Sequence, residues 1–210
     1  MCMQESNWKK GILAADSTGV ETDIYDKKVR PIKSEKRFEK VRVKRFLKWH
    51  IVAVLDHLII LASTITSSST HDSPVLRITL KKVKSTFDLH GSIMNADKAY
   101  DAEANFESLY SMHIHPNIRQ REGSVNKILR HRKKASKEFD EDVYHYRGLI
   151  EGIFGAEERA NHQLHCRYTI KQNQRRFGII KAIGWNLQVL NRLQCAKKLC
   201  IKVAQYPIAN

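Results

Sequence analysis

Residues 92–106 read SIMNADKAYDAEANF, and the pattern of apolar residues changes in the middle of this stretch. The first part, SIMNAD, is a short apolar run that ends in a carboxylate, which is typical of a buried strand. From Asp101 to Met112 apolar side chains recur at helical spacing, which predicts a helix. Asp97 therefore lies between a strand and a helix. It is either a helix cap or one member of a site whose other members are distant in sequence.

Apolar segments before and after this stretch predict further strands of a sheet. Residues 11–16, GILAAD, form a short apolar run that again ends in a carboxylate. Residues 48–56 and 58–68 are rich in β-branched side chains and are interrupted at Asp56, so we expect two paired strands joined by a hairpin turn. Residues 117–122 are expected to be a last strand or an extended segment.

Three other segments have the spacing of helices. They are residues 74–85, where Pro74 suits the first turn, residues 136–160, and residues 177–200. Along the chain, the expected order is strands, a crossover helix, another strand and then helices. This order predicts an α/β domain in which a mixed sheet is flanked by helices.

The charge of the chain indicates its class of partner. With 210 residues the chain is long enough for one domain with its own hydrophobic core. Lysine and arginine total 37 against 22 aspartate and glutamate residues, a formal net charge of +15. Such a protein attracts polyanions before any detailed recognition occurs, so nucleic acid is the leading partner.

Cysteine usage and hydropathy indicate the compartment. The four cysteines form no CxxC pair, and the N-terminus lacks the apolar core of a signal peptide, which together favour a reducing cytoplasm. The most apolar stretch, residues 51–65, is shorter than the roughly 20 residues needed to cross a bilayer. We therefore expect a cytoplasmic protein with no membrane partner.

Two basic tracts are candidate nucleic-acid surfaces. Residues 27–48 carry 11 lysine and arginine residues against two glutamates, and residues 119–137 form a second basic run. Such a run is most often a solvated loop, but the length and one-sided charge of the first also suit a surface that follows phosphates. The candidate DNA contacts in the two tracts are Arg42, Lys44, Arg45, Arg132, Lys133 and Lys134.

Three carboxylates stand apart from the surface acids. Asp16 and Asp97 each end an expected strand, and strand ends on one edge of a mixed sheet converge in space. A helix packed across that edge could add Glu151. Oxygen ligands of this kind suit Mg²⁺ or Mn²⁺. Two such ions about 3.5–4 Å apart activate an attacking water or 3′-hydroxyl and stabilise the leaving oxygen of a phosphodiester.

Other interpretations of these acids remain open from the residues alone. Asp16 could cap a turn, Asp97 could be the N-cap of the following helix, and Glu151 could be a surface glutamate. Asp56 is expected in a hairpin turn. A zinc site is disfavoured because the available ligands match no common finger spacing; they are His162, His165, Cys166, Cys195 and Cys200.

Three segments, in this order, resemble the acidic motifs of the DDE transposases of bacterial and archaeal insertion sequences. They are ADSTG (15–19), NADKAYDA (95–102) and YHYRGLIEGIFG (144–155). STHDSP (69–74), which contains His71 and Asp72, is similar to a His-Asp turn common between the first two acids of the family. The resemblance covers about residues 11–195.

The third segment matches most of the family's Y-x2-R-x3-E-x6-K signature, through Tyr144, Arg147 and Glu151. The final lysine of that signature falls on Glu158, which is followed by Arg159. A carboxylate there would repel a DNA phosphate unless Arg159 takes the place of the lysine.

The resemblance implies a ribonuclease H-like fold and a site in which Asp16, Asp97 and Glu151 bind two Mg²⁺ ions, or Mn²⁺ in their place. It also implies strand cleavage and strand transfer on transposon inverted repeats and target DNA, and it leaves open a homodimer. His71 and Asp72 would support the metal-binding residues without contacting the ions themselves. Further DNA contacts would come from Tyr144, Arg147, Arg159 and Lys98.

Two other functions stay open beside this one. Relatives usually carry a helical region before the first aspartate, whereas fifteen residues precede Asp16 here. A shortened, inactive remnant would bind DNA or transposase subunits without cleavage, and a metal-dependent nuclease would cut without joining. We expect a leader at 1–10, a catalytic domain at 11–200 with a basic insertion at about 27–48, and a tail at 201–210.

A helical wheel gives the third segment two faces besides the one that carries the signature. Tyr146, Ile150, Ile153 and Phe154 form an apolar face. Gly148, Gly152 and Gly155 form a third stripe, and each costs about 1 kcal/mol against alanine in a helix interior. Something is therefore expected to approach this stripe closely, either a packed strand backbone or a DNA backbone.

Overall fold

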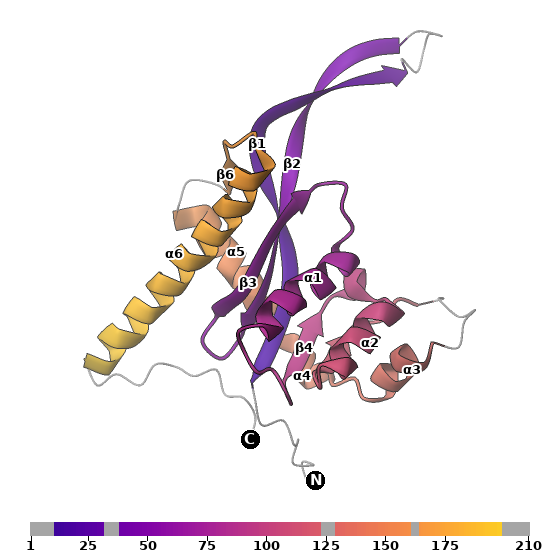
Figure 1. Ribbon diagram of the computed structural model, residues 1–210, viewed down its shortest axis with the longest axis vertical. Coiled ribbons are helices and arrows are strands. Elements are labelled where there is room, and N and C mark those ends of the chain that lie inside the picture. The colour runs from indigo at the N-terminus through magenta and orange to yellow at the C-terminus, as the bar shows by residue number, and fades with distance from the viewer. Residues whose placement is uncertain (1–10, 32–37, 123–128, 161–163, 199–210) are drawn as a thin grey trace.

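The computed structural model describes residues 11–31, 38–122, 129–160 and 164–198 of the chain. Within them a mixed sheet carries helices on both faces (Figure 1), so the predicted α/β class is confirmed. The expected leader at 1–10 and tail at 201–210 lie outside the described residues.

The sheet is built on its longest strand. β1 (Ile12–Pro31), β2 (Phe38–Val54) and β3 (Ile59–Ser67) are antiparallel neighbours, and β4 (Ile93–Ala96) and β5 (His115–Ile118) continue the sheet parallel to β1. The spatial order is β3-β2-β1-β4-β5, and the two-residue β6 (His165–Cys166) also pairs with β1. The sheet is thus mixed, as the predicted fold class requires.

β1 is central because both of its faces are apolar at its start. Ile12 and Ala14 belong to one hydrophobic core, and Leu13 and Ala15 belong to the other. Successive side chains of a strand point to opposite faces, so an unbroken apolar run requires cover on both sides. The helices supply that cover.

Each core is closed by its own set of helices. The core of Leu13 and Ala15 is covered by α1 (Asp72–Lys84), α2 (Glu103–Ser111) and α3 (Arg130–Lys137). The core of Ile12 and Ala14 is covered by α4 (Glu141–His145), α5 (Gly148–Ala160) and the 28-residue α6 (Lys171–Lys198). No helix in the described part of the chain is both long and apolar enough to cross a membrane.

Several predicted elements are confirmed with shifted ends. The two paired strands around Asp56 are β2 and β3, and Asp56 lies in the turn between them. The expected helix at 74–85 is α1, which begins two residues earlier, and the expected strand at 117–122 begins earlier as β5.

The expected loop at 27–48 is wrong for its described part. Residues 27–31 and 38–48 are strand, paired from Lys27 with Arg42 to Pro31 with Phe38. The basic side chains alternate with valines at positions 29, 41 and 43. This period of two favours a strand, and the charge alone gives no reason for a loop.

The single helical segment expected at 136–160 is also wrong. The chain forms the end of α3, then α4, then α5. Asp140 caps α4 by accepting a hydrogen bond from the Val143 backbone N–H at 3.0 Å, and α4 ends at His145 with Tyr146 as its C-cap. Arg147 follows as a turn residue before α5 begins at Gly148. Short helices in close succession keep similar apolar spacing, so periodicity does not show the breaks between them.

Candidate active site

Asp16 and Asp97 occupy equivalent positions on two neighbouring parallel strands. The pairing of β1 with β4 ends at Ala15 opposite Ala96, and each aspartate is the next residue. The sequence predicted that Asp16 ends its strand, and this is wrong, because β1 continues to Pro31 in its pairing with β2. Only the contact with β4 ends there, and this brings the two aspartates to one edge of the parallel part of the sheet.

Glu151 approaches this edge from α5, with Arg147 between the helix and the sheet. Asp16 has the same strand parity as Ile12 and Ala14, so it faces the side that α5 covers. The Arg147 guanidinium donates to the Asp16 carboxylate at 3.2 Å and to the Glu151 carboxylate at 2.8 Å. One cation therefore bridges two carboxylates that are distant in sequence.

The electrostatics of Asp16 report on the other two acids. Burial raises the pKa of Asp16 from 3.8 to about 6, against the lowering effect of the Ser17 N–H and of Arg147. The negative charges of Asp97 and Glu151 each raise this pKa further. Asp97 and Glu151 are thus each close enough to repel Asp16, and a cation at this place would relieve that repulsion.

Asp97 also caps the short helix that follows it. Its carboxylate accepts a hydrogen bond from the Ala99 N–H at 2.8 Å at the start of the 3₁₀ helix η1 (Lys98–Tyr100). The cap and the site position are therefore compatible, because the cap uses a single carboxylate oxygen. Asp101 is not a cap of α2; it pairs with Arg132 instead.

The carboxylates fit a divalent ion by ligand type. Mg²⁺ and Mn²⁺ prefer carboxylate oxygens, and the carboxylate of Asp16 is partly buried and has two negative neighbours, Asp97 and Glu151. As the side chains stand, the described residues contain no group of three or more His, Cys, Asp or Glu that could hold a metal ion. In this arrangement the Arg147 guanidinium contacts two of the three carboxylates.

The zinc interpretation gains nothing from the described part of the chain. Cys166 is buried on β6, whereas Cys195 is exposed on α6. His162 and Cys200 lie outside the described residues.

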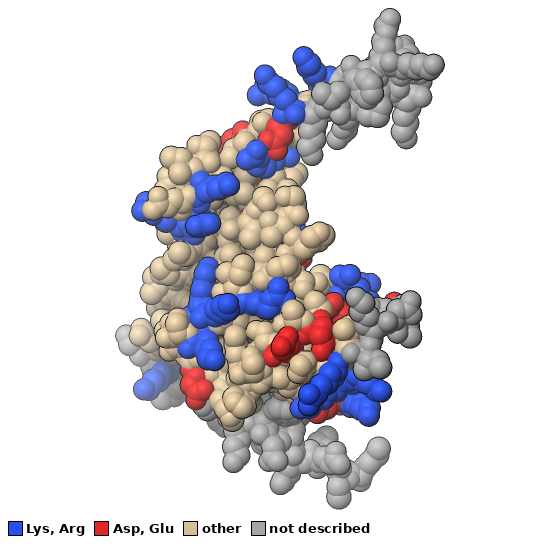
Figure 2. Space-filling model, turned by 45° about the vertical axis from the view of Figure 1, so that its right-hand side comes forward, with Lys and Arg blue, Asp and Glu red and all other residues tan. Residues whose placement is uncertain are grey.

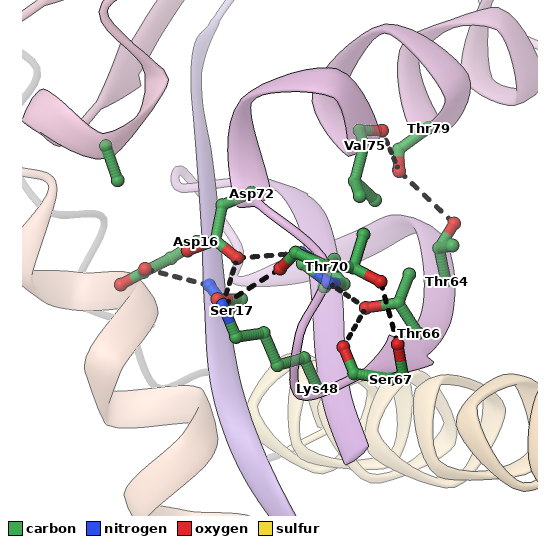
Figure 3. Close-up of polar contacts among 12 residues, drawn as sticks. Asp16, Ser17, Lys48, Thr64, Thr66, Ser67, Thr70, Asp72, Val75 and Thr79 are labelled. Atoms are coloured by element: carbon green, nitrogen blue, oxygen red, sulfur yellow. Dashed lines mark hydrogen bonds and ion pairs between the residues drawn. The ribbon is translucent and has the colours of Figure 1, made fainter.

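Asp72 lies close to the same edge, at the start of α1. Figure 3 shows Lys48 reaching from β2 to Asp72, at 2.9 Å, and to the Thr70 carbonyl, at 3.1 Å. Asp72, Asp16 and Asp97 all raise the pKa of the buried Tyr100, although burial is the largest cause. Asp72 therefore shares the electrostatic environment of the site. His71 is exposed at the preceding position and makes no capping hydrogen bond.

His50, two residues after Lys48 on β2, lies near Asp72 without a hydrogen bond to it. Its Nδ1 lies 3.9 Å from the Asp72 carboxylate, and its Nε2 lies 2.8 Å from the Thr66 hydroxyl. Burial lowers the pKa of His50 to about 4, so the ring is neutral at pH 7. Lys48, His50 and Tyr100 were not predicted as site residues. Tyr100 lies within the NADKAYDA motif, whereas only pairing with β1 reveals Lys48 and His50.

The predicted DNA contacts near the site differ in exposure. Lys98, beside Asp97, is exposed, and so are Glu158 and Arg159 in the last turn of α5. The Tyr144 ring is partly buried and lies 4.8 Å from the Arg119 guanidinium, a contact that the sequence did not predict.

The predicted contacts of the second basic tract are divided between two roles. Arg132 donates two hydrogen bonds, at 2.8 and 2.9 Å, to Asp101, whose side chain is 3% exposed. Lys133 and Lys134 are exposed on α3, and the Lys134 amino group lies 4.3 Å from the Tyr110 ring centre. Arg132 is therefore held within the fold, while the two lysines face solvent.

The glycine stripe of α5 is open. An added Cβ at Gly148 or Gly152 would meet no atom within 4 Å, and at Gly155 it would meet the side chain of Arg159. The expected packed strand backbone is thus wrong for the described residues. The DNA alternative stays a prediction.

One comparison with known proteins identifies a family over most of the chain. The family model described as the transposase DDE domain matches residues 7–187. None of the curated proteins searched matches the chain.

Two solved structures also match. A pre-cleavage Mos1 transpososome is 10% identical with a TM-score of 0.38, covering 69% of this chain and 53% of that one. A Mos1 transposase paired-end complex with left transposon end is 12% identical with a TM-score of 0.37, covering 72% and 54%. The chain thus spans about half the length of these solved chains.

Proposed function

Because this chain belongs to the family of transposase DDE domains, we propose that residues 11–200 are a catalytic domain that cleaves and joins DNA strands at transposon ends. The observation that carries the proposal is the adjacency of Asp16 and Asp97 after the last β1–β4 pair, with Glu151 across from them. The matched Mos1 structures are, by their titles, a transpososome and a complex with a transposon end, which supports DNA as the substrate.

Asp16, Asp97 and Glu151 would hold divalent metal ions, in our proposal two Mg²⁺ or Mn²⁺. Members of this family generally use divalent ions. Bound ions of this kind activate the attacking oxygen and stabilise the leaving oxygen of a phosphodiester. The raised pKa of Asp16, about 6, means that protons compete with a cation for this carboxylate below that pH.

The other residues of the site position the reactants. Arg147 neutralises part of the charge of Asp16 and Glu151, and together with Tyr144 it would place the DNA strand beside them. Lys48 fixes Asp72, which keeps a third aspartate out of direct competition for the ions. The net charge of +15 supports salt-sensitive attraction of DNA to this acidic edge. We propose that the protein acts in the cytoplasm and that a homodimer is the assembly that holds paired ends.

Substitution of Asp97 tests the proposal. Asp97→Asn keeps an oxygen for the cap on η1 but removes the negative charge. The substrates are duplexes that carry the inverted repeats flanking the coding sequence of this protein. We expect the variant to lose Mg²⁺-dependent cleavage of these duplexes and to retain salt-sensitive DNA binding. Asp142→Asn, an exposed aspartate at the start of α4, is the control and should leave cleavage unchanged.

Thermal unfolding supplies a second readout. At ten times its Kd, a bound ion stabilises the folded state by about 1.4 kcal/mol, so Mn²⁺ should raise the Tm of the parent protein and of Asp142→Asn but not of Asp97→Asn. Retained cleavage in Asp97→Asn would refute the site. Binding without nicking in the parent protein would indicate an inactive remnant, and cutting without joining would indicate a nuclease.

A further inference from the structure

β1 and β2 continue well beyond the rest of the sheet. The pairing of β1 with β6 ends at Thr22, and the pairing of β2 with β3 ends at Leu47. Within the described residues, 23–31 and 38–46 then pair only with each other, and we call this two-stranded projection the arm. Figure 1 shows it leaving the body as a narrow ribbon. Nine residues of strand span about 30 Å.

The strand register assigns the arm's side chains to two faces. Lys27 lies opposite Arg42, and Tyr25 lies opposite Lys44. Opposite residues of an antiparallel pair share a face, as do residues two apart on one strand, so Lys40 belongs to the same face. The position of the Arg42 guanidinium, 5.3 Å from the centre of the Tyr25 ring, agrees with this assignment.

The positive charges of the arm are compensated unequally. On the opposite face Arg45 is paired with Asp26, and at the base of the arm Lys44 donates to Glu21 at 2.6 Å. For Lys27, Lys40 and Arg42 the described residues offer no carboxylate partner, and all three side chains are exposed. These three residues form what we call the basic face. In the space-filling view, lysine and arginine side chains gather on the arm as well as on the body (Figure 2).

We propose that the basic face of the arm binds the phosphate backbone of duplex DNA through Lys27, Lys40 and Arg42. Residues two apart on a strand repeat every ~6.6 Å, close to two base-pair rises of ~3.4 Å. A two-stranded ribbon also fits the major groove, so the arm is able to follow the duplex with this face toward the phosphates. Lys44 and Arg45 are already paired with Glu21 and Asp26, so in this proposal they contribute little to DNA binding.

This inference rests on the proposed function and divides the basic tract into two classes. By charge alone, all five cations of residues 27 and 40–45 are equivalent, because each lies in the same basic tract. The register and the ion pairs separate three cations that have no carboxylate partner among the described residues from two that are paired. A surface that only attracted polyanions through net charge would not distinguish the classes.

Two charge-matched double variants of the whole chain test the division. Lys27→Ala/Lys40→Ala and Lys44→Ala/Arg45→Ala each remove two positive charges from the arm. Binding to a 30-base-pair duplex of random sequence is measured by fluorescence anisotropy in EDTA between 0.05 and 0.3 M salt. Each lost phosphate contact lowers the slope of log K against log salt by about 0.9, so the first variant should lose about 1.8 in slope and about 60-fold in affinity at 0.1 M. The second should stay within about threefold.

The outcomes separate this inference from the proposed function. Equal losses of DNA affinity in the two variants would mean that the arm acts only through its net charge. No loss of affinity in either variant would mean that the arm does not contact DNA. Because the measurement is made in EDTA, it does not depend on cleavage, and Asp97→Asn tests cleavage separately. Far-ultraviolet circular dichroism checks folding, and Lys27→Gln/Lys40→Gln, which keeps longer polar side chains, replaces the alanine variant should that one unfold.

Discussion

Two groups of carboxylates lie close together in this molecule and differ in how far their negative charge is compensated. The acidic edge consists of Asp16, Asp97 and Glu151, and the guanidinium of Arg147 contacts two of these carboxylates, Asp16 and Glu151. The acidic brace consists of Asp101 and Glu103, only a few residues after Asp97, and its carboxylates are covered by donors. Asp101 accepts from the Arg132 side chain and from the Arg121 N–H at 2.8 Å; Glu103 accepts from the N–H groups of His131 and Arg132 at 2.8 and 2.9 Å.

The pKa shifts express the same contrast. Burial raises the pKa of Asp16, and its two acidic neighbours raise it further, to about 6. Burial also acts to raise the pKa of Glu103, but the hydrogen bonds from His131 and Arg132 outweigh it and leave the pKa lowered. The brace therefore joins α2 to α3 with its charge satisfied. The acidic edge retains surplus negative charge, which costs stability in the absence of a bound ion. A cation can bind at this place.

The largest expected effect is a loss of stability when the ion pair of the acidic brace is removed. Arg132→Ala leaves the carboxylate of Asp101, 3% exposed, without its bidentate partner. Removing one partner of a buried ion pair costs about 3–5 kcal/mol, so we expect that loss in the free energy of unfolding measured with urea. Lys133→Ala, at an exposed neighbouring position, should change it by less than about 0.5 kcal/mol. Equal effects would mean that Arg132 is a surface cation, as the sequence suggested.

The second prediction has the opposite sign and concerns the edge. Asp16→Asn should stabilise the metal-free protein at pH 8. The pKa of Asp16 is 3.8 in an ordinary setting and about 6 in the fold, so ionisation costs stability as the pH rises from 3.8 to 6, and the cost is constant above. The shift corresponds to about 3 kcal/mol.

Urea unfolding in EDTA at two pH values checks the sign. The gain of Asp16→Asn over the parent protein should be about 2–3 kcal/mol at pH 8 and should fall below about 1 kcal/mol at pH 4, where the carboxyl is protonated in the fold and only about half ionised in the unfolded chain. A loss of stability at pH 8 would show that Arg147 more than compensates the charge of Asp16. The acidic edge would then resemble the brace.

Local patterns predicted much of the fold but not this contrast. The apolar runs before Asp16 and Asp97 indicated two buried strands, and the parallel pairing of β1 with β4 then placed the aspartates together. The β-branched runs around Asp56 likewise predicted β2 and β3. Such elements are predictable because burial and alternation are properties of neighbouring residues.

Ion pairs between distant segments left no comparable signal. Arg132 and Asp101 are 31 residues apart, and Arg147 and Asp16 are 131 apart. Among the described residues Glu157 is also buried, with Lys181 of α6 at 3.1 Å, although a glutamate in a helix suggests a surface position. Whether a charged side chain is free or paired depends on the packing of segments, and one-dimensional charge patterns do not contain that information. The basic tract was misread as a loop for a different reason, because its charge was given more weight than the alternation of its valines.

The smallest expected effect tests whether the open face of α5 beside Glu151 belongs to the acidic edge. Gly152 in α5 and Gly184 in α6 are both helix-interior glycines at which an added Cβ would meet no atom within 4 Å. Replacing either by alanine should raise the free energy of unfolding by about 0.5–1 kcal/mol, because alanine restricts the unfolded chain more and favours helix. If a DNA backbone approaches α5 at this stripe, Gly152→Ala should also slow strand cleavage several-fold, whereas Gly184→Ala should not. Matched cleavage rates in the two variants would make Gly152 an ordinary exposed position. The approach of DNA to the edge would then have to come from the side of Lys98 and η1.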